Sequence, residues 1–150
     1  MKEQKIEDIT KPRDIAILAG LNSPRLSDAD NANEETMDEL EALVETAGGQ
    51  TAASVLQNRA APDPRTFIGE GKVAELKELV KNEAATTVIF DNDLSPSQLR
   101  VLTGELGVQV LDRSALILDI FAQRARTREG RLQVELAQYQ YLLPRLTGMW

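Results

Sequence analysis

The sequence predicts an α/β protein with a small, mostly parallel sheet of four strands, flanking helices and a long helical segment at its end. Between residues 14 and 111, four short apolar or β-branched runs alternate with three amphipathic stretches at helical spacing. After residue 112 the composition is helical almost throughout. The 150 residues, 42% of them hydrophobic, suffice for one domain and an appended element. We therefore expect a flexible lead-in at 1–12, an α/β subdomain at 13–112 and a helical subdomain at 113–150.

The first half of the α/β subdomain is predicted from its apolar runs, caps and breakers. A buried strand is expected over 14–20, followed by an acidic loop. Asn33 can cap a helix, which Gly48 and Gly49 end. A second strand is expected over 51–56, and a loop with two prolines follows it.

The second half of the α/β subdomain repeats the alternation of strands and helices. An amphipathic helix follows the glycine-containing segment 66–72, and the strand expected over 86–90 is nearly all apolar or β-branched, as a strand covered on both faces should be. Ser95 and Pro96 supply the cap and first turn of a third helix, and a short strand is expected over 108–111. Apolar strands that alternate with amphipathic helices imply a mostly parallel sheet with right-handed crossovers, while the order of its strands stays open.

The helical subdomain carries an apolar seam. Its members recur every seven residues, at Leu118, Ala125, Leu132, Tyr139 and Leu146. Such a seam needs a partner to cover it. Because Gly130 weakens a helix, we expect two segments, at about 113–127 and about 130–147, in place of one continuous helix. Pro144 should kink the last turns.

Composition excludes several function classes. The chain has no cysteine and no histidine, which removes disulfides, the usual zinc sites and nucleophilic catalysis by a thiol or a Ser-His pair. Its first residues are charged, with no apolar signal region behind them, and no apolar run approaches the length that spans a bilayer. We expect a soluble, cytoplasmic chain without a membrane partner.

Charge divides along the chain. The formal net charge is −7, yet residues 113–150 hold six arginines against three acidic side chains. The candidates for contact with RNA are Arg124, Arg126, Arg128, Arg131 and Arg145. Arginine suits bidentate contacts with phosphate, so this part of the chain could follow an RNA backbone while the acidic body is repelled from it. Alternatively, these arginines solvate one flank of a helix or pair with the acidic body.

A glycine-containing segment before the second helix is a weak candidate for anion binding. Gly69, Gly71 and Lys72 stand where free backbone N–H groups could cradle a phosphate. The pattern is not a Walker A motif, because Thr66 replaces its first glycine and Val73 replaces the Ser or Thr after the lysine. The alternative is that the glycines serve a tight turn and close packing of the helix on the sheet.

Asp91 and Asp93 follow the third strand and are weak candidates for Mg²⁺ ligands. The carboxyl ends of parallel strands are where α/β sheets place such carboxylates. Two acidic residues in a short loop are also ordinary turn chemistry. The sequence otherwise predicts no metal site.

Several longer strings carry a resemblance to a known family. They are Phe67-Ile-Gly-Glu-Gly-Lys-Val73, the segment 88–98, the segment 112–125, the stretch 127–138 and Leu142-Leu-Pro-Arg-Leu146. In this order they resemble the N-terminal region of HflX-type ribosome-associated GTPases. The resemblance covers about residue 13 to residue 150. The chain departs from the usual family pattern at Val101, which we expect to be exposed.

The resemblance implies a function in ribosome binding. It implies an α/β subdomain and a long antiparallel helix pair ahead of a G domain, in proteins that bind the large ribosomal subunit and its RNA and that split or rescue stalled ribosomes. We find no phosphate loop, no D-x-x-G and no N-K-x-D here, so we expect no catalytic residues and no cofactor in this chain, with GTP and Mg²⁺ in the missing G domain. The partner of the last helix is also missing.

Two other functions stay open. The first is a nucleotide-binding α/β module that uses the segment Gly69 to Lys72 with Asp91 and Asp93. The second is self-association, in which the uncovered seam recruits the same helix from another copy.

Overall fold

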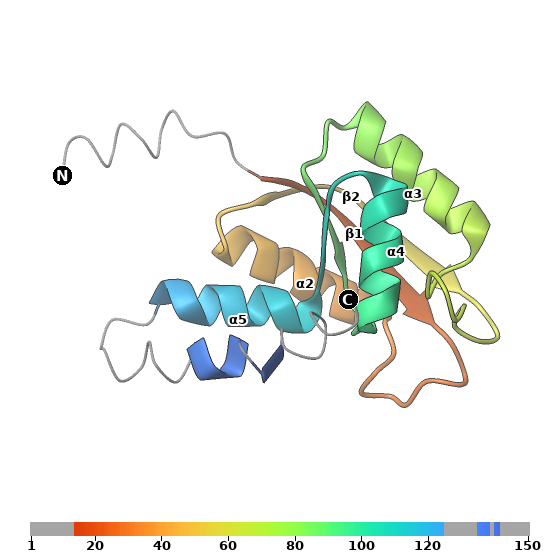
Figure 1. The fold of residues 1–150 in the computed structure, drawn as a ribbon, viewed down its shortest axis with the longest axis horizontal. Coiled ribbons are helices and arrows are strands. Elements are labelled where there is room, and N and C mark those ends of the chain that lie inside the picture. The colour runs from red at the N-terminus through yellow and green to blue at the C-terminus, as the bar shows by residue number, and fades with distance from the viewer. Residues whose placement is uncertain (1–13, 125–134, 139, 142–150) are drawn as a thin grey trace.

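A four-stranded parallel sheet forms the centre of the protein in the computed structural model, which describes residues 14–124, 135–138 and 140–141 (Figure 1). The strands are β1 (Ile15–Asn22), β2 (Gln50–Asn58), β3 (Thr87–Phe90) and β4 (Gln109–Asp112). They lie in the order β2-β1-β3-β4, and every neighbouring pair is parallel. The predicted α/β class is confirmed, and the strand order adds what the sequence left open.

Helices cover both faces of the sheet. They are α2 (Glu34–Thr46), α3 (Glu70–Asn82), α4 (Pro96–Leu106) and α5 (Arg113–Arg124). Alternate β1 residues serve two cores, because successive side chains of a strand point to opposite faces. Ile17 packs in the core that holds Leu76 of α3 and Leu102 of α4. Leu18 packs in the core that holds Leu40 of α2 and Leu116 of α5. The body is thus a sheet between two helical layers.

The predicted helix caps are present. The Asn33 side chain accepts a hydrogen bond from the Thr36 N–H at 2.9 Å, and the Thr36 hydroxyl oxygen accepts one from the Asn33 N–H at 2.8 Å. This reciprocal box fixes the start of α2. Ser95 makes the same kind of box at the start of α4, and Gly107 ends that helix in the left-handed region at φ 71°.

Two strands run further than their apolar residues predict. β1 extends to Asn22 and β2 to Asn58, and these two residues pair across the sheet. Polar side chains are tolerated there because they bond to neighbouring loops. Asn22 donates to the Ala32 carbonyl, and Gln57 accepts from the Gly69 N–H.

Most of the segment predicted to form a helical subdomain lies outside the described residues. These include the expected bend at Gly130, the kink at Pro144 and four of the five seam positions, Ala125, Leu132, Tyr139 and Leu146. α5 is described to Arg124, and residues 135–138 and 140–141 are helical. The Tyr141 hydroxyl donates to the Asp112 carboxylate, at the end of β4. Within the described ranges, no helix has the length and apolarity needed to cross a membrane.

The prediction that Val101 is exposed is wrong. It is half-buried on α4, directly before the fully buried Leu102. Because successive helical residues are about 100° apart, Val101 lies on the flank of the face that packs on the sheet.

Candidate functional site

The candidate site is the carboxyl edge of the sheet, at the point where the order of the strands reverses. β2 lies on one side of β1, whereas β3 and β4 lie on the other. In open α/β sheets, ligands bind at this switch point, outside the carboxyl ends of the strands. The residues after β1 and β3 therefore decide what this edge can do.

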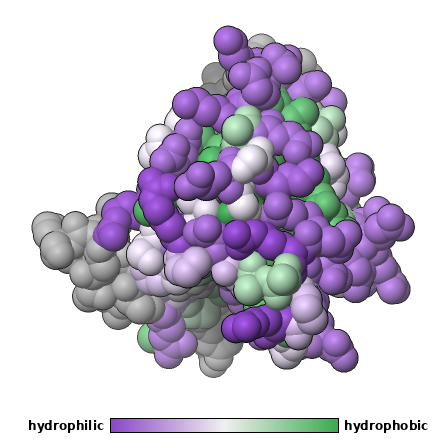
Figure 2. All heavy atoms as spheres, turned by 90° about the vertical axis from the view of Figure 1, so that its right-hand side faces the viewer, coloured by the Kyte–Doolittle hydropathy of each residue, from purple (hydrophilic) through white to green (hydrophobic). Residues whose placement is uncertain are grey.

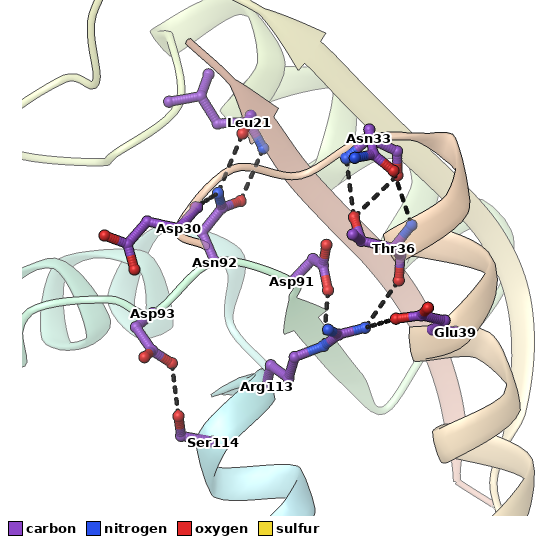
Figure 3. A network of polar contacts seen from close by, with 10 residues as sticks. All are labelled: Leu21, Asp30, Asn33, Thr36, Glu39, Asp91, Asn92, Asp93, Arg113 and Ser114. Carbon is purple, nitrogen blue, oxygen red and sulfur yellow. Dashed lines mark hydrogen bonds and ion pairs between the residues drawn. The ribbon is translucent and has the colours of Figure 1, made fainter. Parts of the chain in front are cut away.

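Asn92 occupies the switch point. Its side-chain oxygen accepts from the Leu21 N–H at 2.8 Å, and its amide nitrogen donates to the carbonyls of Leu21, at 3.0 Å, and Asp30, at 2.8 Å. Only 3% of its surface is exposed. Figure 3 shows this amide joining the end of β1 to the loop after it. The space between β1 and β3 is thus bridged by a side chain of the protein itself.

A second amide fixes the loop that follows β1. Asn31 accepts from the Ser23 N–H at 2.8 Å and donates to the Ser23 carbonyl at 2.9 Å. The fully buried Ser23 donates its hydroxyl to the Ala60 carbonyl at 3.0 Å. These bonds hold the loops after β1 and β2 together over the edge.

Asp91 forms a buried ion pair with the first residue of α5. Its Oδ1 lies 2.9 Å from Nε of Arg113, and the Asp91 side chain is only 2% exposed. The contact lacks hydrogen-bond geometry, and neither atom has another hydrogen-bond partner. Nη2 of Arg113 also donates to the Thr36 carbonyl at 2.9 Å and lies 3.6 Å from Glu39 (Figure 3). Arg113 therefore ties β3 and α5 to α2.

Asp93 has a different partner. Its Oδ1 accepts from the Ser114 hydroxyl at 2.8 Å, also at the start of α5. The two carboxylates proposed for Mg²⁺ are thus directed to two different residues (Figure 3). Within the described residues, no group of three or more acidic side chains is placed to hold a metal ion.

The proposed anion-binding segment is engaged by the protein. The Gly69 N–H donates to Oε1 of Gln57 at 2.9 Å, and Nζ of Lys72 pairs with Glu75 at 2.9 Å. A Cβ at position 69 would lie 3.1 Å from Nε2 of Gln57, so Gly69 permits a close approach, as the packing alternative predicts. A Cβ at Gly71 would meet nothing within 4 Å, so no contact explains that glycine.

A strained turn precedes this segment and was not predicted from the sequence. Phe67 has φ 66°, and the Ile68 N–H donates to the Thr66 carbonyl at 2.7 Å. This is a three-residue γ-turn around a left-handed aromatic residue, a rare and strained arrangement. The turn buries both Phe67 and Ile68. In the sequence, the only signal for this turn is that two apolar residues stand next to each other in a loop.

Asp63 organises the loop before that turn. Its Oδ1 accepts from the N–H groups of Thr66, at 3.0 Å, and Arg65, at 2.8 Å. These backbone hydrogen bonds, that of Thr66 first, lower the pKa of Asp63, and the charge of Arg59 adds to the effect. The hydrogen bond with Glu105 raises the pKa of Arg65 and lowers that of Glu105.

The arginines predicted to contact RNA are mostly outside the described residues. Arg124 is the last residue of α5, and Arg126, Arg128, Arg131 and Arg145 lie beyond it. Their role stays a prediction.

A cavity of about 540 Å³ lies away from the switch point. It runs along the edge strand β4, between α4 and α5, toward Asp14, which precedes β1, and toward Thr87 and Gln109, the first residues of β3 and β4. No sequence-predicted site residue lines it.

Two family models match most of the chain, from residue 34 onward. One, described as "GTP-binding GTPase N-terminal", matches residues 34–122. Another, described as "GTP-binding GTPase Middle Region", matches residues 124–150.

Curated relatives carry the name "GTPase HflX". The relative from Alkalihalophilus pseudofirmus is 48% identical over 145 residues, which are 95% of this chain and 33% of the relative. The relative from Escherichia coli is 50% identical over 116 residues, covering 77% of this chain and 27% of the relative. The chain spans about a third of the length of such relatives.

Solved structures have the same fold. A GTP-binding protein from Sulfolobus solfataricus, in complex with GDP, is 28% identical and matches with a TM-score of 0.67 over 91% of this chain and 39% of that one. A second structure, of SsGBP with GDP, matches with a TM-score of 0.71 over 90% of this chain and 37% of that one.

Proposed function

Because the chain belongs to the HflX family of GTPases and corresponds to the N-terminal region of its members, we propose that it binds the large ribosomal subunit and has no catalytic activity of its own. The observation that carries this proposal is the match of two family models, one of the N-terminal region to residues 34–122 and one of the middle region to residues 124–150. In this proposal, the gene product splits or rescues ribosomes in the cytoplasm. GTP and Mg²⁺ are held by a G domain outside these residues.

The geometry of the carboxyl edge argues against nucleotide binding by the α/β body. Asn92 bridges the switch point with protein-protein hydrogen bonds. The Gly69 N–H is bonded to Gln57 and Lys72 is paired with Glu75. A nucleotide at this edge would have to displace these partners, and displacing the buried Asn92 would leave the backbone N–H and carbonyl of Leu21 unsatisfied.

The partner in this proposal is ribosomal RNA of the large subunit, and the arginines from Arg124 onward supply cationic contacts. A pelleting assay of the gene product with large subunits at moderate salt tests this part. The variant with Arg124, Arg128 and Arg131 changed to Ala should bind more weakly, because each lost phosphate contact removes counterion release. Unchanged binding would remove these arginines from the interface.

Self-association is a second candidate, favoured by one observation. Phe121 of α5 and Leu136 are large apolar side chains that are 55% and 60% exposed. Exposed apolar side chains of this size gain free energy when a partner covers them. Light scattering of the chain and of Leu136→Lys tests this candidate. A concentration-dependent dimer that the substitution weakens would support it, whereas a monomer at every concentration would refute it.

A further inference from the structure

The sheet has two edge strands of different length. Within the described ranges, the order β2-β1-β3-β4 leaves one side of β2 and one side of β4 without a neighbouring strand. β4 has four residues, whereas β2 has nine. An edge strand presents a row of unpaired N–H and C=O groups, to which another extended chain can hydrogen-bond.

The pairing with β1 shows which backbone groups of β2 face outward. The Arg59 N–H donates to the Asn22 carbonyl at 3.0 Å, just beyond the end of β2. In a parallel pair, the residues that bond to the neighbouring strand alternate along the chain. The residues whose N–H and C=O groups point away from β1 are therefore Ser54, Leu56 and Asn58. No described residue forms a backbone hydrogen bond with these groups.

β2 has few of the features that protect an exposed edge. Such edges are usually short, or they carry charged residues, prolines or bulges. β2 contains no charged residue and no proline. Its irregularity lies near its start, where the pairing with β1 skips Ala52. From Ala53 to Asn58 the pairing is regular, over a length that suits the addition of a further strand.

An acidic flank of α2 lies beside this edge. α2 contacts β1 and β2, while α5 contacts β3 and β4, so the two helices lie side by side over one face of the sheet. Arg113 of α5 donates to the Thr36 carbonyl, which marks the flank of α2 that faces α5. At about 100° per residue, the opposite flank is turned toward the free side of β2. It carries Glu34, Asp38, Glu41 and Glu45.

These four carboxylates determine what kind of partner the edge accepts. All four are exposed, and none has an ion-pair partner among the described residues. Two-fold pairing of β2 with a second copy would bring two such acidic flanks together, and they would repel each other. A nucleic acid is repelled for the same reason. A protein segment with basic side chains is attracted.

The side of the molecule that carries α3 and the loop after β2 is polar. Figure 2 shows that hydrophilic residues dominate there and that hydrophobic ones are scattered. A protein interface built on side chains has an apolar centre. Strand addition does not depend on one, because main-chain hydrogen bonds supply the affinity.

We infer that the free edge of β2 binds an extended, basic segment of a partner protein as an added strand, and that the acidic flank of α2 selects its lysine and arginine side chains. Because successive side chains of a strand point to opposite faces, the basic residues stand at every second position, on the α2 side of the sheet. The inference goes beyond the proposed function, since it concerns a protein partner and a surface distant in sequence from the arginines assigned to RNA.

A designed peptide tests the edge directly. The probe is a fluorescent peptide of about eight residues in which lysine alternates with threonine, and the control peptide has glutamate in place of lysine. Fluorescence anisotropy measures the affinity of each peptide for the full-length gene product. The lysine peptide should bind at least about ten-fold more tightly than the glutamate peptide.

Two matched pairs of substitutions test the acidic flank. Glu41→Gln with Glu45→Gln removes two charges beside the edge, whereas Glu35→Gln with Glu39→Gln removes two charges elsewhere on the same helix. The first pair should weaken binding of the lysine peptide about ten-fold. The second should weaken it less than about two-fold, because salt screens exposed charges that lie further from the peptide.

A proline substitution tests the backbone of the edge. Ser54→Pro removes an N–H group that faces the free side and leaves the bonds to β1 in place. It should weaken binding of the lysine peptide at least about ten-fold, whereas Ser54→Ala keeps the N–H and should bind like the unaltered protein. Thermal unfolding checks that both variants are folded. A lysine peptide that is N-methylated at alternate residues tests the same hydrogen bonds on the unaltered protein, and it should bind as weakly as Ser54→Pro does.

Three results would overturn the inference. The first is equal binding of the lysine and glutamate peptides, or no binding of either. The second is weaker binding of the α2 variant with no effect of Ser54→Pro or of N-methylation, which would mean that charge alone holds the peptide. The third is a dimer of the gene product that Ser54→Pro dissociates, which would make a second copy the occupant. The affinity for large ribosomal subunits tests the proposed function separately.

Discussion

Nε of Arg113 lies 2.9 Å from Oδ1 of Asp91, where α5 begins beside the end of β3. Arg113 is the first residue of α5, and Asp91 is the first residue after β3. Because the same guanidinium donates to the Thr36 carbonyl of α2, the ion pair sets where α5 begins relative to two other elements. This contact therefore holds the start of α5 against the end of β3 and against α2.

Removing Asp91 should destabilise the protein strongly. Asp91→Ala leaves the partly buried Arg113 without its close carboxylate, and the expected cost is about 3 kcal/mol in the free energy of unfolding. Glu39→Ala removes the other carboxylate near Arg113, which is 3.6 Å away and 61% exposed, and should cost less than about 1 kcal/mol. Urea unfolding of both variants measures the difference. Equal costs would show that the buried pair has no special role.

Asn92 should not tolerate an isosteric acid. Asn92→Asp replaces the amide that donates to the Leu21 and Asp30 carbonyls with a group that only accepts. The buried carbonyls then face a carboxylate, and we expect a loss of about 3 kcal/mol or more. The same change at the exposed Asn58 should alter stability by less than about 0.5 kcal/mol. Thermal unfolding of the two variants distinguishes them, and similar melting temperatures would contradict the role given to Asn92.

At position 67, a glycine variant should be more stable than an alanine variant, which reverses the usual order. Both Phe67→Ala and Phe67→Gly lose the buried ring, but at φ 66° only glycine avoids strain. Phe67→Gly should thus be more stable than Phe67→Ala by about 1 kcal/mol. At the exposed helical position Ala74, the change to Gly should instead cost about 1 kcal/mol. A Phe67→Ala variant as stable as Phe67→Gly would mean that the turn is not strained.

Asp63 should make stability depend on pH in the acid range. Folding lowers its pKa through the N–H groups of Thr66 and Arg65, so its carboxylate stabilises the fold above its unfolded-state pKa. This contribution is lost as the pH falls through the lower folded-state pKa. Asp63→Asn keeps an acceptor but no charge, so wild type should be more stable than the variant at about pH 7 and should approach it at about pH 2. Urea unfolding at the two pH values checks this, and a constant difference would refute it.

The sequence predicted the elements well because their signals are local. Asn33 and Ser95 carry their caps within three residues, and Gly107 ends α4 by its own backbone conformation. Alternating apolar runs likewise predict a parallel sheet without knowledge of distant contacts. The order of the strands depends on which crossover packs on which face, and no local pattern encodes that choice.

The candidate site was harder to predict because its contacts join distant residues. Asn92 bonds to Leu21, which is 71 positions away, and Arg113 bonds to Thr36, which is 77 positions away. The sequence drew attention to Asp91 and Asp93 as charged residues, yet the neutral Asn92 between them bridges the switch point. An amide can satisfy both a backbone donor and a backbone acceptor, and only the fold reveals which backbone it meets.

In the proposed function, this N-terminal region binds the large ribosomal subunit. The most direct measurement is the affinity of the full-length gene product for purified large and small subunits at the same moderate salt concentration. We expect saturable binding to the large subunit and much weaker binding to the small one. Equal affinity for the two subunits, or no saturable binding to the large one, would contradict it.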